Sequence, residues 1–322
     1  MKRIFVCFLA LVALFAGCKN DLDTNADWKE ILVIYSLLST SDTTHYVRVN
    51  RAFLSENQSA LEIAKRSDSL QFDSLDVKIL ETDNGGGVKN VYQLNWVVLD
   101  KDTGIFASED NRIFTFDAVL NKDYIYKLIV TNKLTGNVAT AQTALVDKAQ
   151  PGSISGEIDT VKFYRVSLTA GRNAKVYDVI MRFHWNEYDS ATNTLIDSSY
   201  IDWPVGTSRE VVNNQVINNV PGNVFYTYLA AFVPGITGKY RVPTHMDFYF
   251  WGADSEYFIY HGVNKPSIGI VQKKPEYTNI SSGNYGLFAS RNLYKVVNVN
   301  PTVRFKGILQ TYGATRHLKF RQ

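Results

Sequence analysis

The chain has few cysteines, no strong excess of either charge and only one long hydrophobic run, and these shortages exclude several classes of protein. Its 322 residues include 34 Lys plus Arg and 31 Asp plus Glu, so the net charge is +3. Without a basic tract, the chain is a poor candidate for nucleic-acid binding. Hydrophobic residues make up 45% of the chain, which excludes an intrinsically disordered protein. No internal repeat is visible, which argues against solenoids and propellers.

The two cysteines, Cys7 and Cys18, both lie near the N-terminus. Cys7 falls within an apolar segment that we expect to be removed, and Cys18 is expected to carry lipid. The mature chain would then have no free cysteine, so the sequence predicts no disulfide, no cysteine-ligated zinc and no thiol nucleophile. An exported domain without disulfides must be stabilised by its own hydrophobic core.

The long apolar run is the strongest signal for location. Basic Lys2 and Arg3 precede the run Ile4–Ala16, and Gly17 with Cys18 follows it. This order of a charged, an apolar and a small-residue segment is typical of a secretory signal peptide. A spanning helix needs about 20 apolar residues, more than this run supplies. We therefore predict that residues 1–17 are a cleaved signal peptide.

The residues around the cleavage point separate a lipoprotein from an ordinary exported protein. Phe15-Ala16-Gly17-Cys18 resembles the bacterial lipobox, in which the cysteine thiol carries a diacylglyceryl group and the terminus is tri-acylated, with chains such as palmitate. Several acyl chains anchor a protein stably to one leaflet. The polar residues 18–27 predict a flexible tether. This resemblance predicts a lipid-anchored protein that faces either the periplasm or the cell surface, and an ordinary cleaved signal peptide is the alternative.

Alternating short runs predict a mainly β protein with two domains. The Leu120–Val130 segment resembles the fibronectin type III pattern, in which a tyrosine bonds its hydroxyl back to upstream backbone to form a tyrosine corner. Tyr126 is the candidate for this role. We predict that residues 28–148 form an immunoglobulin-like or fibronectin-like β-sandwich, with an amphipathic helix over Gln58–Arg66 and a hairpin tip at Gly85–Gly87.

A breaker-rich segment from Gln150 to Ser153 predicts the boundary between the domains. Beyond it, residues 153–322 predict a second, antiparallel β-rich domain, in which Met246–Trp251 is a buried strand. The domain is expected to contain one or two short helices, over Asn223–Val233 and from Ser255, whose start Asp254 could cap.

No strong catalytic or metal-binding motif occurs in the sequence. The five histidines show no ligand spacing, and no Gly-x-Ser-x-Gly nucleophile motif is present. His245 and Asp247 would share one face of a strand, whereas His184 and Glu187 would point apart. A pair without a third ligand is weak evidence, so we predict no catalytic residue, no cofactor and no metal ligand.

Aromatic residues are abundant, with 19 Tyr, 18 Phe and 5 Trp. Trp185, Trp203 and Trp251 are candidates for a platform on which sugars stack. Alternate residues of every strand face inward, however, and aromatic side chains favour strands, so most of these rings are expected to belong to the core.

The segment Lys274–Ala289, which reads KPEYTNISSGNYGLFA, resembles the Asn-Ile, Gly-rich, Gly-x-Phe ending of a Bacteroidota lipoprotein family, domain of unknown function 4249. The Asp247 strand and the Ser255-Glu256-Tyr257 helix fit the order of this family. The resemblance implies an outer-membrane lipoprotein with a β-sandwich and a second β domain, often encoded near TonB-dependent transporters, and it brings no catalytic residues.

The sequence therefore predicts a non-enzymatic lipoprotein of the cell envelope that acts as a binding or accessory module. Its expected partners are the membrane, through the lipid anchor, and a TonB-dependent transporter or a polysaccharide. The alternative is a surface glycan-binding protein or a glycosidase, because aromatic rings bind sugars and two carboxylates can hydrolyse them.

Overall fold

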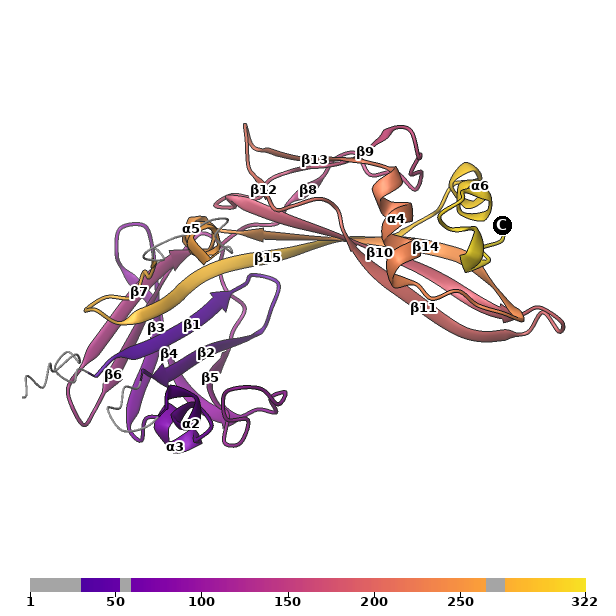
Figure 1. Cartoon of the computed structure of the whole chain (residues 1–322). Helices are drawn as coiled ribbons and strands as arrows, with labels where there is room; N and C mark the ends of the chain where they lie inside the picture. The colour runs from indigo at the N-terminus through magenta and orange to yellow at the C-terminus, as the bar shows by residue number, and fades with distance from the viewer. Residues whose placement is uncertain (1–29, 53–58, 265–275) are drawn as a thin grey trace, which may run out of the picture.

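The computed structural model describes residues 30–52, 59–264 and 276–322, which form two lobes (Figure 1). The predicted signal peptide, Cys18 and the tether over residues 18–27 lie outside the described residues. The fold is mainly β, as the alternating sequence pattern predicts. One path of paired strands runs through both lobes, and a small three-stranded sheet lies beside it.

The described residues before position 148, which lie in the N-terminal lobe, form seven strands and two short helices. In chain order these elements are β1 (Leu32–Leu38), β2 (Thr44–Arg51), α2 (Ala60–Ala64), α3 (Ser67–Leu70), β3 (Leu75–Thr82), β4 (Val88–Val98), β5 (Arg112–Asp117), β6 (Ile125–Asn132) and β7 (Val138–Ala144).

The remaining elements are β8 (Gln150–Pro151), β9 (Phe163–Thr169), β10 (Val176–Asp189), β11 (Leu195–Pro204), β12 (Arg209–Glu210), β13 (Gln215–Pro221), α4 (Asn223–Phe232), β14 (Lys239–Ala253), α5 (Ser255–Asn264), β15 (Tyr285–Val299), α6 (Val303–Thr311) and a 3₁₀ turn (Arg316–Leu318).

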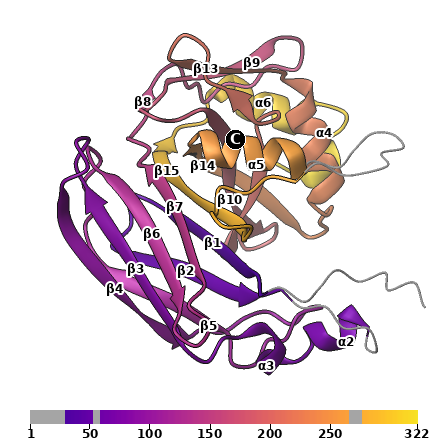
Figure 2. The ribbon, with the colours of Figure 1, turned by 90° about the vertical axis from the view of Figure 1, so that its left-hand side faces the viewer.

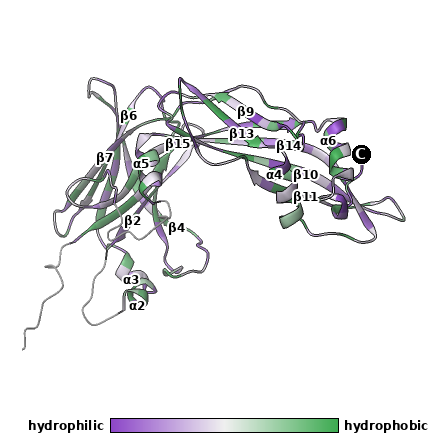
Figure 3. Cartoon of the chain, turned by 45° about the horizontal axis from the view of Figure 1, so that its top comes forward, coloured by the Kyte–Doolittle hydropathy of each residue, from purple (hydrophilic) through white to green (hydrophobic). Residues whose placement is uncertain are grey.

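The N-terminal lobe resembles a β-sandwich, with α2 and α3 at one end (Figure 2). Alternate residues of its strands point inward, because successive side chains on a strand face opposite sides. Figure 3 shows the resulting mixture of hydrophobic and hydrophilic residues along the strands. The inward set forms one continuous core cluster, which includes Ile34, Val49, Ile79, Phe116 and Leu128.

Tyr126 lies at the centre of this lobe and is fully buried. Its hydroxyl accepts a hydrogen bond from the Asn121 backbone nitrogen at 2.7 Å and donates to Glu81 Oε1 at 2.7 Å. The side chain therefore bonds back to backbone five residues upstream, as a tyrosine corner does. Glu81, itself buried, also accepts hydrogen bonds from Tyr92 and Asn90.

The C-terminal lobe has a layer of long strands covered on one face. The small sheet of β8, β9 and β13, together with α4 and α6, lies on one side of β10 and β14 (Figure 1). Phe183 of β10 packs edge-on against Phe225 of α4 and Phe305 of α6, with ring centroids 5.6 and 5.7 Å apart. These aromatic contacts form the middle of a second core cluster, separate from that of the N-terminal lobe.

Strand β15 belongs to both lobes. Its first residues pair in parallel with β1, where Gly286 lies opposite Ile34, and its later residues pair antiparallel with β14. Members of the two core clusters lie on both sides of the predicted boundary at residues 148–153, because Val146 packs in the C-terminal cluster while Ile280 and Phe288 pack in the N-terminal one. The local composition of Gln150–Ser153 indicates a domain boundary. Composition does not predict that a strand from the C-terminal part of the chain, β15, pairs with β1 of the first lobe.

Three of the α-helices agree with the sequence patterns, and two others, α3 and α6, were not predicted. α2, α4 and α5 form within or close to the predicted segments, and the Asp254 side chain accepts a hydrogen bond from Tyr257 N at the start of α5. α6 was not predicted, although the Thr302 side chain caps it by accepting from Phe305 N.

No helix within the described ranges is long and apolar enough to cross a membrane.

We predict that Glu81→Gln destabilises the protein by about 1–3 kcal/mol at pH 7, because buried donors lose a carboxylate partner. Burial alone would raise the pKa of Glu81, but hydrogen bonds from Asn90, Tyr126 and Tyr92 hold that pKa below its ordinary value of 4.5. The folded state then binds fewer protons, so wild-type stability should fall as the pH drops from about 4.5 through the folded pKa.

Urea denaturation at pH 7 and at pH 3.5 would measure both effects. Glu109→Gln, at an exposed carboxylate of the same lobe, is the control and should leave stability unchanged. An acid response of the Glu81→Gln variant as steep as that of the wild type would contradict this role.

Candidate functional site

The open face of the C-terminal lobe carries polar side chains from three neighbouring strands. On β10 and β14, Phe183, Met246 and Phe248 point into the core cluster. The alternate positions therefore point to the other face of the sheet, and they include His184 and Asp247. This face lies opposite the layer formed by β9, β13, α4 and α6 (Figure 1).

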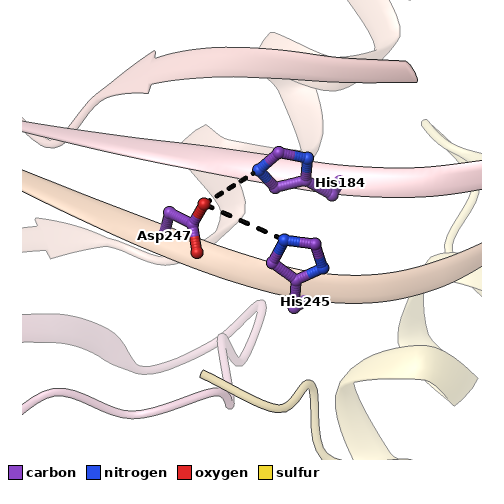
Figure 4. Close-up of side chains that lie close together, drawn as sticks. All are labelled: His184, His245 and Asp247. Carbon is purple, nitrogen blue, oxygen red and sulfur yellow. Dashed lines mark hydrogen bonds and ion pairs between the residues drawn. The ribbon is translucent and has the colours of Figure 1, made fainter. Parts of the chain in front are cut away.

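Three of these side chains form a compact cluster. Asp247 Oδ2 lies 3.2 Å from His184 Nε2 and 3.8 Å from His245 Nε2 (Figure 4). The two imidazole rings stack, with centroids 4.1 Å apart and planes 13° apart. In the described part of the chain, this is the one group of three such side chains close enough to hold a metal ion.

Two irregularities in the strand ladders lie at this cluster. The β10–β14 register shifts between Phe183 and Trp185, at His184, and the β14–β15 register shifts between Met246 and Phe248, at Asp247. Bulges of this kind redirect side chains and free backbone groups from the ladder. Here the Asn298 backbone nitrogen donates to Asp247 Oδ1 at 2.9 Å.

Arg182 precedes His184 by two residues on β10 and therefore shares its face, but Arg182 pairs with another carboxylate. Its Nε and Nη2 atoms donate to the two oxygens of Asp202 at 2.7 and 2.8 Å. The pKa of His184 lies below its ordinary value of 6.5, chiefly because of burial and then because of His245, while Asp247 opposes the shift.

The sequence analysis found two members of the cluster and missed the third. It correctly expected His245 and Asp247 to share a strand face, but it paired His184 only with Glu187. His184 comes from a different strand, and its approach to Asp247 depends on the β10–β14 register. Alternation within one strand gives the face of a residue but not the residue opposite, so no local signal could have completed the set.

Two of the three candidate stacking tryptophans cannot contact a ligand. Trp185 and Trp203 are 4% and 2% exposed and belong to the C-terminal core cluster. That part of the prediction is wrong, because both side chains occupy the inward positions of their strands. Trp251 is half-buried, and the Arg291 guanidinium lies 4.8 Å from its ring centroid, so one face of the ring is already covered.

A cleft of about 620 Å³ lies where α5 and β7 approach the start of β10, and it is lined by Arg172, Lys175 and Asp254. Burial raises the pKa of Asp254, although three donors oppose that shift. These donors are Thr143 Oγ1, Ser290 N and Tyr257 N, at 2.7 to 2.9 Å. The carboxylate therefore acts as a structural link between strands and the helix.

Strand β4 of the N-terminal lobe exposes an unusual amount of apolar surface. Leu94, Trp96 and Val98 share one face by alternation, but only Leu94 is buried, while Trp96 and Val98 are 50% and 56% exposed. The β4 residues up to Leu94 pair with β3 and the later ones pair with β5. The face of β4 that is buried in the core at Leu94 is therefore exposed to solvent at Trp96 and Val98.

We predict that Trp203→Ala destabilises the C-terminal lobe by about 3–5 kcal/mol, because it leaves a large cavity in a packed aromatic core. Trp251→Ala should cost clearly less, since its side chain is only half-buried. Thermal unfolding of the two variants beside the wild type would measure the difference. Equal stability losses would contradict the distinction between a core ring and a surface ring.

No protein-family model and no curated protein sequence matches this chain. Among solved structures, the C-terminal globular domain of an oligosaccharyltransferase from Pyrococcus abyssi is similar at 9% sequence identity and a TM-score of 0.19. The likeness covers 63% of this chain and 41% of that one, so this chain spans about two fifths of the other's length. A TM-score this low carries no argument about fold or function.

Proposed function

We propose that this protein is a non-enzymatic, lipid-anchored binding module of the bacterial cell envelope, which docks a partner protein through strand β4. The observation that carries the proposal is the apolar face of β4, which leaves the core at Leu94 and continues through the exposed Trp96 and Val98. Contiguous exposed apolar surface of this kind is characteristic of interaction sites.

The composition of this surface favours a protein over a sugar. On this face Val98 is aliphatic and 56% exposed, and its side chain offers no hydrogen bond to hydroxyl groups. Trp96 is contacted by Arg112, whose guanidinium lies 4.8 Å from the ring centroid. Tryptophan and arginine are enriched at the centres of protein interfaces, where apolar neighbours surround them.

The pairing of β4 also offers backbone groups to a partner. Its two halves pair with different strands, β3 and then β5, so each half has one edge outside these ladders. An extended segment can add to such an edge by main-chain hydrogen bonds. A TonB-dependent transporter is the partner class that the family resemblance implies, and an accessory subunit of such a transporter is the role we propose.

The rival role, glycan binding or hydrolysis, has less support. Two of its three candidate rings lie in the core, and the third has Arg291 over one face. Buried carboxylates that could have served as acids or bases, Glu81 and Asp254, accept hydrogen bonds from several structural donors.

Val98→Asp should lower recovery of the partner at least about tenfold, because it introduces a charge at the centre of an apolar contact. The test is affinity purification from gently solubilised, cross-linked outer membranes, with quantification of the proteins that accompany the bait. Val161→Asp, at an 86% exposed valine of the other lobe, is the matched control and should recover the partner as the wild type does.

Wild type and Val98→Asp recovering the same proteins in equal amounts would contradict the role of β4. Recovery of no protein by the wild type, together with sugar release or saturable binding on a polysaccharide panel, would favour the rival role.

Cys18→Ala should move the protein from the membrane fraction to the soluble envelope fraction, since it removes the site of acylation and with it the anchor. Fractionation of cells that express each form, followed by immunoblotting, measures this. Ser39→Ala, which leaves the lipobox intact, is the control. Persistent membrane attachment of Cys18→Ala would show that the lipid is not on this residue.

A further inference from the structure

Each of the three side chains in the cluster on the open face of the C-terminal lobe can offer a lone pair, because a neutral imidazole has one acceptor nitrogen and an ionised carboxylate has acceptor oxygens. One neutral imidazole can donate its single N–H to Asp247 Oδ2. One possible metal-ligand atom from each of His184, His245 and Asp247 also lies within 4.8 Å of the other two. Two cationic imidazoles stacked at 4.1 Å would repel each other. A divalent cation between the three side chains could take one lone pair from each of them, once the stacked imidazole rings turn so that a nitrogen of each faces the ion.

We propose that His184, His245 and Asp247 bind one divalent transition-metal ion, and that Zn²⁺ is the ion this site fits best. Imidazole nitrogen and carboxylate oxygen are ordinary zinc ligands. Ligand atoms of a tetrahedral zinc site lie about 3.3 Å apart, which follows from zinc–ligand distances of about 2.0–2.1 Å. The observed separations of 3.2 and 3.8 Å from Asp247 Oδ2 are close to this value.

The backbone around the cluster fixes the carboxylate in the orientation a metal needs. Asp247 Oδ1 accepts the hydrogen bond from Asn298 N at 2.9 Å, which leaves Oδ2 toward the two imidazoles (Figure 4). Asn298 has φ 59°, a left-handed conformation that occurs here at the β14–β15 register shift. A partner of this kind, which orients a ligand, is typical of protein metal sites.

The charges around the cluster are compatible with a cation. Arg182, the neighbouring positive group, makes a two-point ion pair with Asp202 rather than with Asp247. In the described part of the chain, the ion pairs of Asp247 are with His184 and His245 and not with a lysine or an arginine. The Asp247 carboxylate therefore remains available to bind a metal ion.

The site would be open on one side. Three protein ligands leave a fourth tetrahedral position for water or for a group of a ligand. The histidine side chains are partly exposed, at 22% and 32%, so an ion can reach them from solvent. The site lies on the opposite lobe from strand β4, and it does not depend on the partner proposed for that strand.

The first experiment is a titration of the intact lipoprotein in detergent, freed of metal with a chelator, with Zn²⁺ in a calorimeter. We expect one ion per chain with a dissociation constant of about 1 μM or tighter. Co²⁺ in place of Zn²⁺ should give the intense visible absorption of a tetrahedral complex. Absence of saturable binding, or octahedral Co²⁺ with no change in the visible spectrum, would overturn the proposal.

Variants identify the ligands. His245→Gln should weaken Zn²⁺ binding by more than the 10–100-fold that changes in outer-shell partners cost. His261→Gln, at a half-buried histidine of α5, is the matched control and should bind as the wild type does. Unchanged binding by His245→Gln would mean that the ion is held elsewhere and would overturn the assignment.

A second experiment uses the wild-type protein, so that its result does not depend on whether a variant folds. Zn²⁺ should protect His184 and His245, but not His261, from modification by diethyl pyrocarbonate, as read by peptide mass spectrometry. Equal modification of His184 with and without Zn²⁺ would contradict the site.

Discussion

The backbone ladder of β15 is the constraint on which the arrangement of the two lobes depends. Its first half forms a parallel ladder with β1, and its second half pairs antiparallel with β14. Gly286 lies where this ladder passes β1, and a β-carbon there would lie 1.8 Å from the Ile34 carbonyl oxygen. Only glycine permits this approach, and its φ of 124° is also one that other residues rarely adopt. Nearby, Asn284 Oδ1 accepts a hydrogen bond from Leu32 N, which adds a side-chain contact between the starts of β1 and β15.

Because β15 continues into the C-terminal lobe, its register against β14 also affects the polar cluster. Asp247 lies at the shift in that register, and the backbone freed there orients its carboxylate. The cluster is therefore a property of three strands together: β10 supplies His184, β14 supplies His245 and Asp247, and β15 supplies the orienting N–H. The same strands bury aromatic rings on their other face, so the core and the candidate site are two sides of one sheet.

Buried charge in this protein is mainly structural. Glu81 joins β3 to the tyrosine corner, and Asp254 links α5 to β15 and to Thr143. In the C-terminal lobe, Arg241 donates to Glu187 at 2.8 Å and to the carbonyl oxygen of Pro234 at 2.9 Å. Unpaired burial of such groups is costly, which explains why each of them has several partners. The two surfaces that we propose as functional differ from these groups in exposure, because Trp96 and Val98 are exposed and the two histidines of the cluster are partly exposed.

The amino-acid sequence by itself determined the β class, the hairpin tip at Gly85–Gly87, the start of α5 at Asp254 and the tyrosine at position 126, because alternation, turn residues and capping are local properties. It also indicated that His245 and Asp247 share a face. The tertiary structure alone decided that β15 returns to the first lobe, that Trp185 and Trp203 are core residues, and that His184 meets Asp247. These features depend on the pairing and register of strands far apart in the chain, which alternation within a single strand does not specify.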